Sequence, residues 1–388
     1  MNRSDESPRI FHLSPSATGR RNFIRGGAAA IGALLSGYAT AGTSRRTYSV
    51  AVLGDLHFDS PDRARYHADY THSTTRKRYE AHLAEHVRNA EMWSERMPRL
   101  LRASAACTRA DTAFVLQMGD LVQGDCGKRE THERMLADAF RVVKGAYGGR
   151  LPFVSVVGNH DIRGDVEGDG ALEAFDAWQP AVVGRELGVK AKGTTFSFRQ
   201  GPDVFIVVDF NDPRPDMAEV KRLLRESEGA RHTFIVTHGP AIPHGEGRWF
   251  LLGKAGRDTE RRELRALLAR RNAIVLAGHT HVMERCDCTM PEGRITQFVF
   301  NSVWSKPELA RPEIVAKGVG QYGTAAKKPS RHGGTGGPSL VAEYRPFVKD
   351  FLLAKAAGHY RLEVKGEHVD VVFYGGDATV PTSTFRLR

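Results

Sequence analysis

The sequence predicts a layered α/β protein whose functional groups gather where buried strands end. Five short apolar runs have the length of strands, and each stops at a glycine or threonine beside a polar side chain. The runs cover residues 48–53, 113–118, 151–157, 233–236 and 273–277. Segments between them have apolar residues at helical spacing. In layered α/β proteins, groups far apart in sequence meet outside the carboxyl ends of the strands.

The segments around these runs predict the other elements. Helices are expected at 80–109 and 129–146, and a short one at 170–178, with His82 and His86 on the surface of the first. The second half adds a hairpin, two helices, a strand and a terminal antiparallel pair that extends the second sheet, expected at residues 194–209, 217–227, 257–271, 295–304 and 359–388.

The strand ends carry a mixed set of nitrogen and oxygen ligands. Imidazole, carboxylate and amide oxygen together suit divalent manganese, iron, zinc or nickel. Seven candidate ligands exceed what one ion uses once water is counted, so two cations that share a bridging carboxylate and a water are expected. The candidates are Asp55, His57, Asp120, Asn159, His238, His279 and His281.

These motifs also form a recognisable series. Asp-x-His, Gly-Asp, Gly-Asn-His-Asp, a single His and Gly-His-x-His occur in order between residues 48 and 304, and the set resembles the calcineurin-like metallophosphoesterases. The resemblance implies a four-layer αββα sandwich of two mixed β-sheets flanked by helices, with a dinuclear metal site at the strand ends. It assigns Asp55, His57, Asp120 and His281 to one metal, and Asp120, Asn159, His238 and His279 to the other.

The resemblance also implies a reaction, the hydrolysis of phosphate esters by a hydroxide shared between the metals. His160 would act as general acid at the leaving oxygen or stabilise the phosphate, and Asp161 would orient it. Gln123 stands where purple acid phosphatases carry a tyrosine, and Gln123-Gly124-Asp125 does not match the Asp-Arg-Gly of protein Ser/Thr phosphatases. The expected substrate is therefore a small phosphomonoester or phosphodiester, such as a nucleotide.

Two alternatives remain open, an exported nuclease of the same fold and a catalytically silent scaffold. The formal net charge of +11 favours nucleic acid as a partner. However, lysine and arginine are scattered along the chain without a concentrated basic stripe, which disfavours a nuclease. A scaffold is disfavoured because every ligand position is filled.

Residues 1–41 resemble a twin-arginine export signal. Arg20 and Arg21 precede an aromatic residue, a modestly apolar stretch covers 26–37, and Ala39-Thr40-Ala41 forms a small-residue cleavage site. The stretch is too short for a stable membrane anchor. We therefore expect a soluble periplasmic or secreted protein that the twin-arginine translocase exports.

Residues 42–388 are expected to form a single catalytic domain with an irregular insertion at 305–345. Substrate choice is assigned to this insertion and to the loops at 58–79 and 240–256, whose polar and aromatic residues suit either substrate contacts or ordinary loop packing; among them are His67, His72, Arg76, Lys77, Arg248 and Trp249. The cysteines are expected to be unpaired thiols, although an oxidising compartment would permit a bridge from Cys126 to Cys286 or Cys288; the fourth cysteine is Cys107.

Overall fold

The computed structural model describes residues 47–71, 76–166, 168–211, 213–244, 250–254, 256–324 and 337–388. The chain divides into two compact units, Met1–Gly42 and Thr43–Arg388, and all described residues belong to the second. The expected export signal thus lies outside the described residues. Within the described ranges, no helix is long and apolar enough to cross a membrane.

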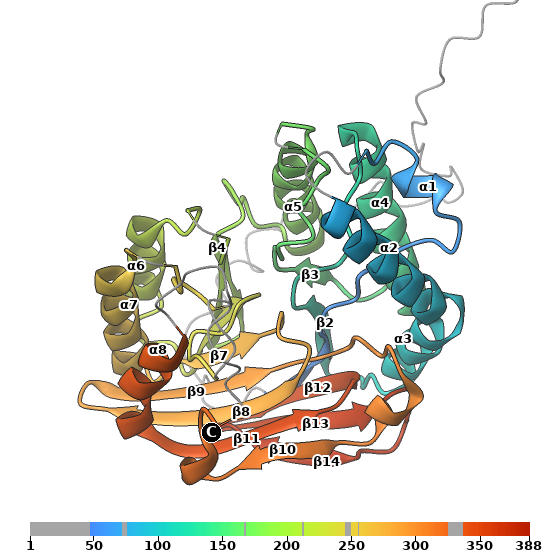
Figure 1. Ribbon diagram of the computed structural model, residues 1–388. Helices are drawn as coiled ribbons and strands as arrows, with labels where there is room; N and C mark the ends of the chain where they lie inside the picture. The colour runs from blue at the N-terminus through green and yellow to red at the C-terminus, as the bar shows by residue number, and fades with distance from the viewer. Residues whose placement is uncertain are drawn as a thin grey trace, which may run out of the picture. The chain divides into compact units, whose positions relative to one another are not determined.

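Two mixed sheets form the centre of the second unit (Figure 1). The first has the order β14-β13-β12-β1-β2-β3, in which β1 to β3 are parallel and β12 is antiparallel to β1. Its strands are β1 (Thr47–Leu53), β2 (Thr112–Gln117), β3 (Phe153–Ser155), β12 (Gly358–Lys365), β13 (His368–Gly375) and β14 (Ser383–Arg386).

The second sheet has the order β10-β11-β8-β9-β7-β6-β5-β4. Its parallel centre, β5-β6-β7-β9, is flanked on both sides by antiparallel strands. Its strands are β4 (Phe196–Gln200), β5 (Asp203–Val208), β6 (Thr233–Thr237), β7 (Ile274–Ala277), β8 (Met283–Met290), β9 (Gly293–Val299), β10 (Glu313–Lys317) and β11 (Val348–Lys355).

Helices cover the outer faces of the two sheets (Figure 1). On the first sheet lie α2 (Arg76–Glu91), α3 (Met97–Ala106), α4 (Arg129–Ala146) and α5 (Ala171–Leu187), with a π-helical turn at Met92–Arg96 and the short α1 (Ala64–His67) nearby. On the second lie α6 (Met217–Glu226) and α7 (Asp258–Arg270). The remaining helical segments are α8 (Gly337–Tyr344) and short turns at Pro307–Ala310, Val319–Gln321 and Arg345–Phe347.

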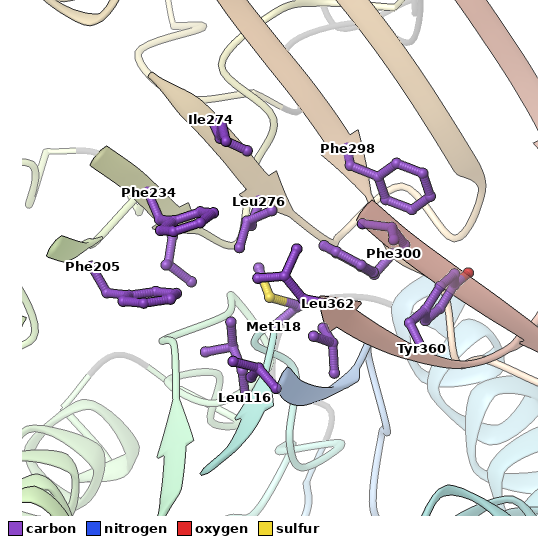
Figure 2. Close-up of a cluster of buried hydrophobic side chains, with 14 of the residues drawn as sticks. Leu116, Met118, Phe205, Phe234, Ile274, Leu276, Phe298, Phe300, Tyr360 and Leu362 are labelled. Carbon is purple, nitrogen blue, oxygen red and sulfur yellow. The ribbon is translucent and has the colours of Figure 1, made fainter. Parts of the chain in front are cut away.

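Three hydrophobic clusters hold these layers together. Between the sheets, Phe114 of β2 meets Phe205 of β5 with ring centroids 5.3 Å apart, and Figure 2 shows Phe205 within this cluster. Because side chains alternate along a strand, Val204 and Ile206 point the other way and pack under α6 and α7. A third cluster joins the first sheet to its helices. Burying each such apolar side chain stabilises the fold by about 1.5–3 kcal/mol. Two mixed sheets flanked by helices confirm the predicted αββα sandwich.

Several boundaries differ from the prediction. The terminal pair of strands extends the first sheet rather than the second, because β12 pairs with β1. The helix expected at 170–178 continues to Leu187 despite Pro180, since Val182 and Val183 are buried. Strands β8 and β11 were not expected, and β10 lies inside the insertion at 305–345 that was expected to be irregular.

All four cysteines are free thiols. Cys126 belongs to the cluster between the first sheet and its helices, whereas Cys286 and Cys288 belong to the cluster on the outer face of the second sheet. The bridge from Cys126 to Cys286 or Cys288 is therefore absent, and the expectation of unpaired thiols agrees with the structure.

Candidate metal centre

The candidate ligands lie on loops that leave the carboxyl ends of the strands. Four of them have left-handed backbones, with φ of 43° at His57, 51° at Asp120, 72° at His279 and 51° at His281. Non-glycine residues rarely adopt this region, which is costly unless the surrounding structure enforces it. Such strain concentrated on one set of residues is typical of a functional site.

One group of ligand atoms comes from Asp55, His57, Asp120 and His281. The Nε2 atoms of His57 and His281 are 3.0 Å apart. His281 Nε2 lies 3.1 Å from Asp55 Oδ2, and His57 Nε2 lies 3.8 Å from Asp120 Oδ2. The first three residues are fully or almost fully buried. These are the four residues that the resemblance assigns to the first metal.

A second group joins Asp120 to His238 and His279. His238 Nε2 lies 3.1 Å from Asp120 Oδ2 and 3.0 Å from His279 Nδ1. Asp120 belongs to both groups, and its other oxygen, Oδ1, accepts a 2.8 Å hydrogen bond from the amide of His160. The backbone thus holds one oxygen of Asp120 and leaves the other between the two groups.

The hydrogen bonds of His238 test whether this site suits a cation. Its Nδ1 lies 2.7 Å from the carbonyl oxygen of Met118, which only accepts, so the ring proton resides on Nδ1. In the neutral ring, Nε2 then presents a lone pair to the Asp120 carboxylate. Asn159 Oδ1 is also buried, with no hydrogen-bond partner among the described residues. Lone pairs facing one another and an unsatisfied oxygen fit divalent metal ions.

The pKa shifts of the histidines in the site also fit a bound cation. Burial lowers the pKa of His57 and of His279, which keeps both rings in the neutral form that binds metals. Burial also lowers the pKa of His238, but the charges of Asp120 and Asp55 outweigh it and raise the pKa to about 9. A proton on His238 Nε2 therefore occupies the position that a cation would take.

Two glycines allow the loops to approach this closely. Gly119 has φ of 89°, and a Cβ there would overlap the His238 ring. At Gly158, a Cβ would overlap the backbone and carboxylate of Asp120. The side chain of any other residue at either position would displace a candidate ligand.

Asp161 is placed differently from the expectation, whereas His160 lies beside the candidate ligand His57. The His160 ring is buried, packs edge-on against His57, and donates from Nδ1 to the carbonyl of Gln123 at 2.9 Å. Asp161 instead accepts hydrogen bonds from the amides of Gly158 and Val122. Gln123, rather than Asp161, therefore orients His160, and Asp161 fixes the loops. Burial raises the pKa of Asp161.

An open pocket of about 300 Å³ lies over these residues. Its lining includes three residues that the motifs did not indicate, namely Glu85 of α2, Arg163 and Thr280. Arg163 makes two hydrogen bonds to Asp125, at 2.7 and 2.6 Å, and one to Glu85 at 2.8 Å. In the sequence, only its position five residues after Gly158 indicated that Arg163 lies near the site. Arg163 brings a cation to the pocket wall.

We expect the replacement Asp125→Asn to lower the free energy of unfolding by roughly 2–3 kcal/mol at pH 7, because it removes the negative charge that pairs most closely with Arg163. Burial raises the pKa of Asp125, but Arg163 and His82 outweigh it and hold that pKa well below its usual range. Its contribution is therefore present above pH ~4 and is lost as pH falls further.

Urea denaturation at pH 7 and pH 3 measures this effect. The difference between the wild type and Asp125→Asn should shrink at pH 3, whereas the surface variant Asp377→Asn should differ little from the wild type at either pH. A difference that does not change with pH would contradict the assignment.

Among the described residues of the loops assigned to substrate choice, none lines the pocket over the candidate ligands. His67 is buried at 1% exposure and faces Asp59 instead of the pocket, while Arg76 and Lys77 lie exposed on α2. His82 and His86, expected on the helix surface, are also buried. His72, Arg248 and Trp249 lie outside the described residues.

The chain is thus a two-sheet α/β sandwich with buried histidines and aspartates at its strand ends, in groups that could hold metal ions. Residues 48–283 match the family model of the calcineurin-like phosphoesterases, which is more than half of the chain. The chain belongs to this family. No curated protein sequence matches it significantly.

Solved structures show the same fold. A purple acid phosphatase, PPD1, from yellow lupin (Lupinus luteus) is 11% identical with a TM-score of 0.51, and the match covers 89% of this chain and 54% of that one. The chain thus spans about half the length of that phosphatase. PhoD is 10% identical with a TM-score of 0.50, over 89% of this chain and 69% of that one. At such identities the likeness concerns the fold alone.

Proposed function

We propose that this protein hydrolyses phosphate esters with two divalent metal ions. The observation that carries the proposal is that Asp120 belongs to both groups of ligand atoms, with one carboxylate oxygen directed between them. Asp55, His57, Asp120 and His281 would hold one ion. Asp120, Asn159, His238 and His279 would hold the other.

A pair of bound cations lowers the pKa of water towards neutrality and polarises phosphoryl oxygens. The chain's own residues bind and orient the ester. Arg163 and His160 line the pocket and would contact phosphate oxygens, and His160 Nε2, the nitrogen not held by Gln123, is available to a leaving oxygen. Asp161 holds the loops that carry Asp120 and Asn159 together through the two hydrogen bonds that its carboxylate accepts from backbone amides.

We further propose a small phosphomonoester or phosphodiester as the substrate. A pocket of about 300 Å³ is at the lower end of small-molecule sites. Glu85 on the wall would repel an extended polyanion, and it already pairs with Arg163. A nuclease is the second candidate, supported by the net charge of +11.

The test is hydrolysis by the full chain loaded with manganese, zinc or iron. The panel contains p-nitrophenyl phosphate, bis(p-nitrophenyl) phosphate, cyclic nucleotides, phospholipid head groups and a single-stranded oligonucleotide. We expect turnover of small esters that chelation abolishes and metal restores. Preferred cleavage of the oligonucleotide, with salt-sensitive binding, would favour the nuclease. Bound metal without hydrolysis of any ester would contradict both.

A further inference from the structure

A second cluster of metal-type ligands lies outside the candidate metal centre. Asp59, His67 and His86 place one oxygen and two ring nitrogens within 4.8 Å of one another. Their exposures are 2%, 1% and 6%. They come from three separate segments, the loop after β1, helix α1 and helix α2.

Asp59 joins the two histidines. Its Oδ1 lies 3.0 Å from His67 Nε2, and its Oδ2 lies 3.1 Å from His86 Nδ1. Neighbouring ligand atoms of an octahedral ion with bonds of ~2.1 Å are about 3.0 Å apart. The separations therefore equal those of adjacent ligands around a transition metal, and they also equal ordinary hydrogen-bond lengths.

The other ring nitrogen of His67 shows that an ordinary hydrogen bond between a neutral His67 and Asp59 does not explain the short separation. His67 Nδ1 lies 3.1 Å from the backbone carbonyl oxygen of Asp125, so it carries the ring proton. In the neutral ring, Nε2 then presents a lone pair to the Asp59 carboxylate. This contact is repulsive unless a second proton or a metal ion lies between them. A histidine whose other nitrogen donates to a carbonyl is the usual arrangement around bound metals.

A third histidine, His82, packs beside the cluster and also contacts Asp125. His82 lies edge-on to His67, with ring centroids 4.9 Å apart, and its Nδ1 lies 3.2 Å from Asp125 Oδ2. Its Nε2 is buried and has no hydrogen-bond partner among the residues that the structure covers. Asp125 thus contacts two of the histidines, one through its backbone and one through its side chain.

We propose that Asp59, His67 and His86 bind a divalent transition-metal ion of the zinc and iron class, separate from the candidate metal centre. Two imidazoles and one carboxylate are ligands that suit such ions. The ion would tie α1 and α2 to the loop that carries His57, two residues before Asp59. Its role would be to hold the wall of the pocket, including Glu85 of α2, against the catalytic loops.

The competing arrangement is a proton in place of the ion. Burial lowers the pKa of His67, but the hydrogen bond that His67 donates to Asp59 and the negative charge of Asp59 outweigh burial and raise that pKa. His67 would then be an imidazolium paired with Asp59, and the cluster would bind no metal.

The number of zinc ions bound per chain distinguishes a cluster that binds a metal ion from one that binds a proton. The full chain is loaded with Zn²⁺, dialysed against metal-free buffer and analysed by elemental analysis. We expect His86→Gln to hold one zinc fewer than the wild type, while hydrolysis at saturating zinc persists. The matched control is His359→Gln. It replaces a buried histidine whose partner is a backbone carbonyl oxygen instead of Asp59, and it should leave the zinc content unchanged. Equal zinc content in His86→Gln and the wild type would overturn the proposal.

A second comparison covers the case in which His86→Gln does not fold. Asp120→Asn removes the residue shared by both groups of the candidate metal centre but leaves the cluster intact. We expect Asp120→Asn to retain one tightly bound zinc that Asp120→Asn with Asp59→Asn has lost. If the two variants hold equal amounts of zinc, the cluster is a proton-linked pair. Neither result depends on hydrolysis, so a failure here is distinct from a failure of the proposed function.

Discussion

Replacing Asp120 by asparagine should lower kcat/KM for bis(p-nitrophenyl) phosphate by about 1,000-fold or more, because the loss of bridged cations removes several kcal/mol of transition-state stabilisation. Asp120 alone belongs to both groups of ligand atoms. Asparagine keeps the size of the side chain and can still accept the amide hydrogen bond of His160. It removes the charge that faces His57 and His238, so the change tests metal binding rather than packing.

Metal content and folding are measured on the same samples. Asp120→Asn should lose metal from the candidate centre but unfold cooperatively like the wild type. Asp377→Asn provides the control, because it also removes one carboxylate, from a surface pair with Arg99 that contributes little, and it should keep full activity. Wild-type turnover in Asp120→Asn would exclude the bridging role.

The sequence predicts the strand ends well because local chemistry determines them. The run at 204–208 is buried on both faces and therefore reads as a continuous apolar segment. Glycines at 119 and 158 follow such runs because a Cβ there would overlap His238 or Asp120. Each ligand motif thus combines a strand, a turn and a candidate ligand within a few residues, and the ligands meet because their loops leave the carboxyl ends of the strands.

What the sequence does not predict depends on partners far along the chain. From the sequence, His86 was expected on a helix surface, because only the fold brings Asp59, 27 residues earlier, within 3.1 Å of it. Arg163 is likewise placed on the pocket wall by Asp125 and Glu85. Strand β8 was missed because it contains three charged residues, Glu284, Arg285 and Asp287. Arg285 and Asp287 pair with each other, and all three also have partners on the neighbouring strands β9 and β11.

His160→Ala should retain the metals and lose turnover in a way that depends on the leaving group. Burial and the charge of Arg163 lower the pKa of His160, and Gln123 holds the proton on Nδ1. Nε2 can donate to a leaving oxygen only when the ring is an imidazolium, which a bound phosphate anion would favour. The acid role is therefore confined to the enzyme with substrate bound.

An alkyl phosphate ester needs a proton on its leaving oxygen, whereas p-nitrophenolate leaves without one. We therefore expect His160→Ala to lower kcat for the alkyl ester by about 100- to 10,000-fold, but to have a much smaller effect on kcat for p-nitrophenyl phosphate. His359→Ala, which removes a buried histidine on β12 distant in sequence from the site motifs, should change neither rate. Equal losses with both esters would indicate that His160 stabilises the phosphate instead, and unchanged turnover of the alkyl ester would exclude both roles.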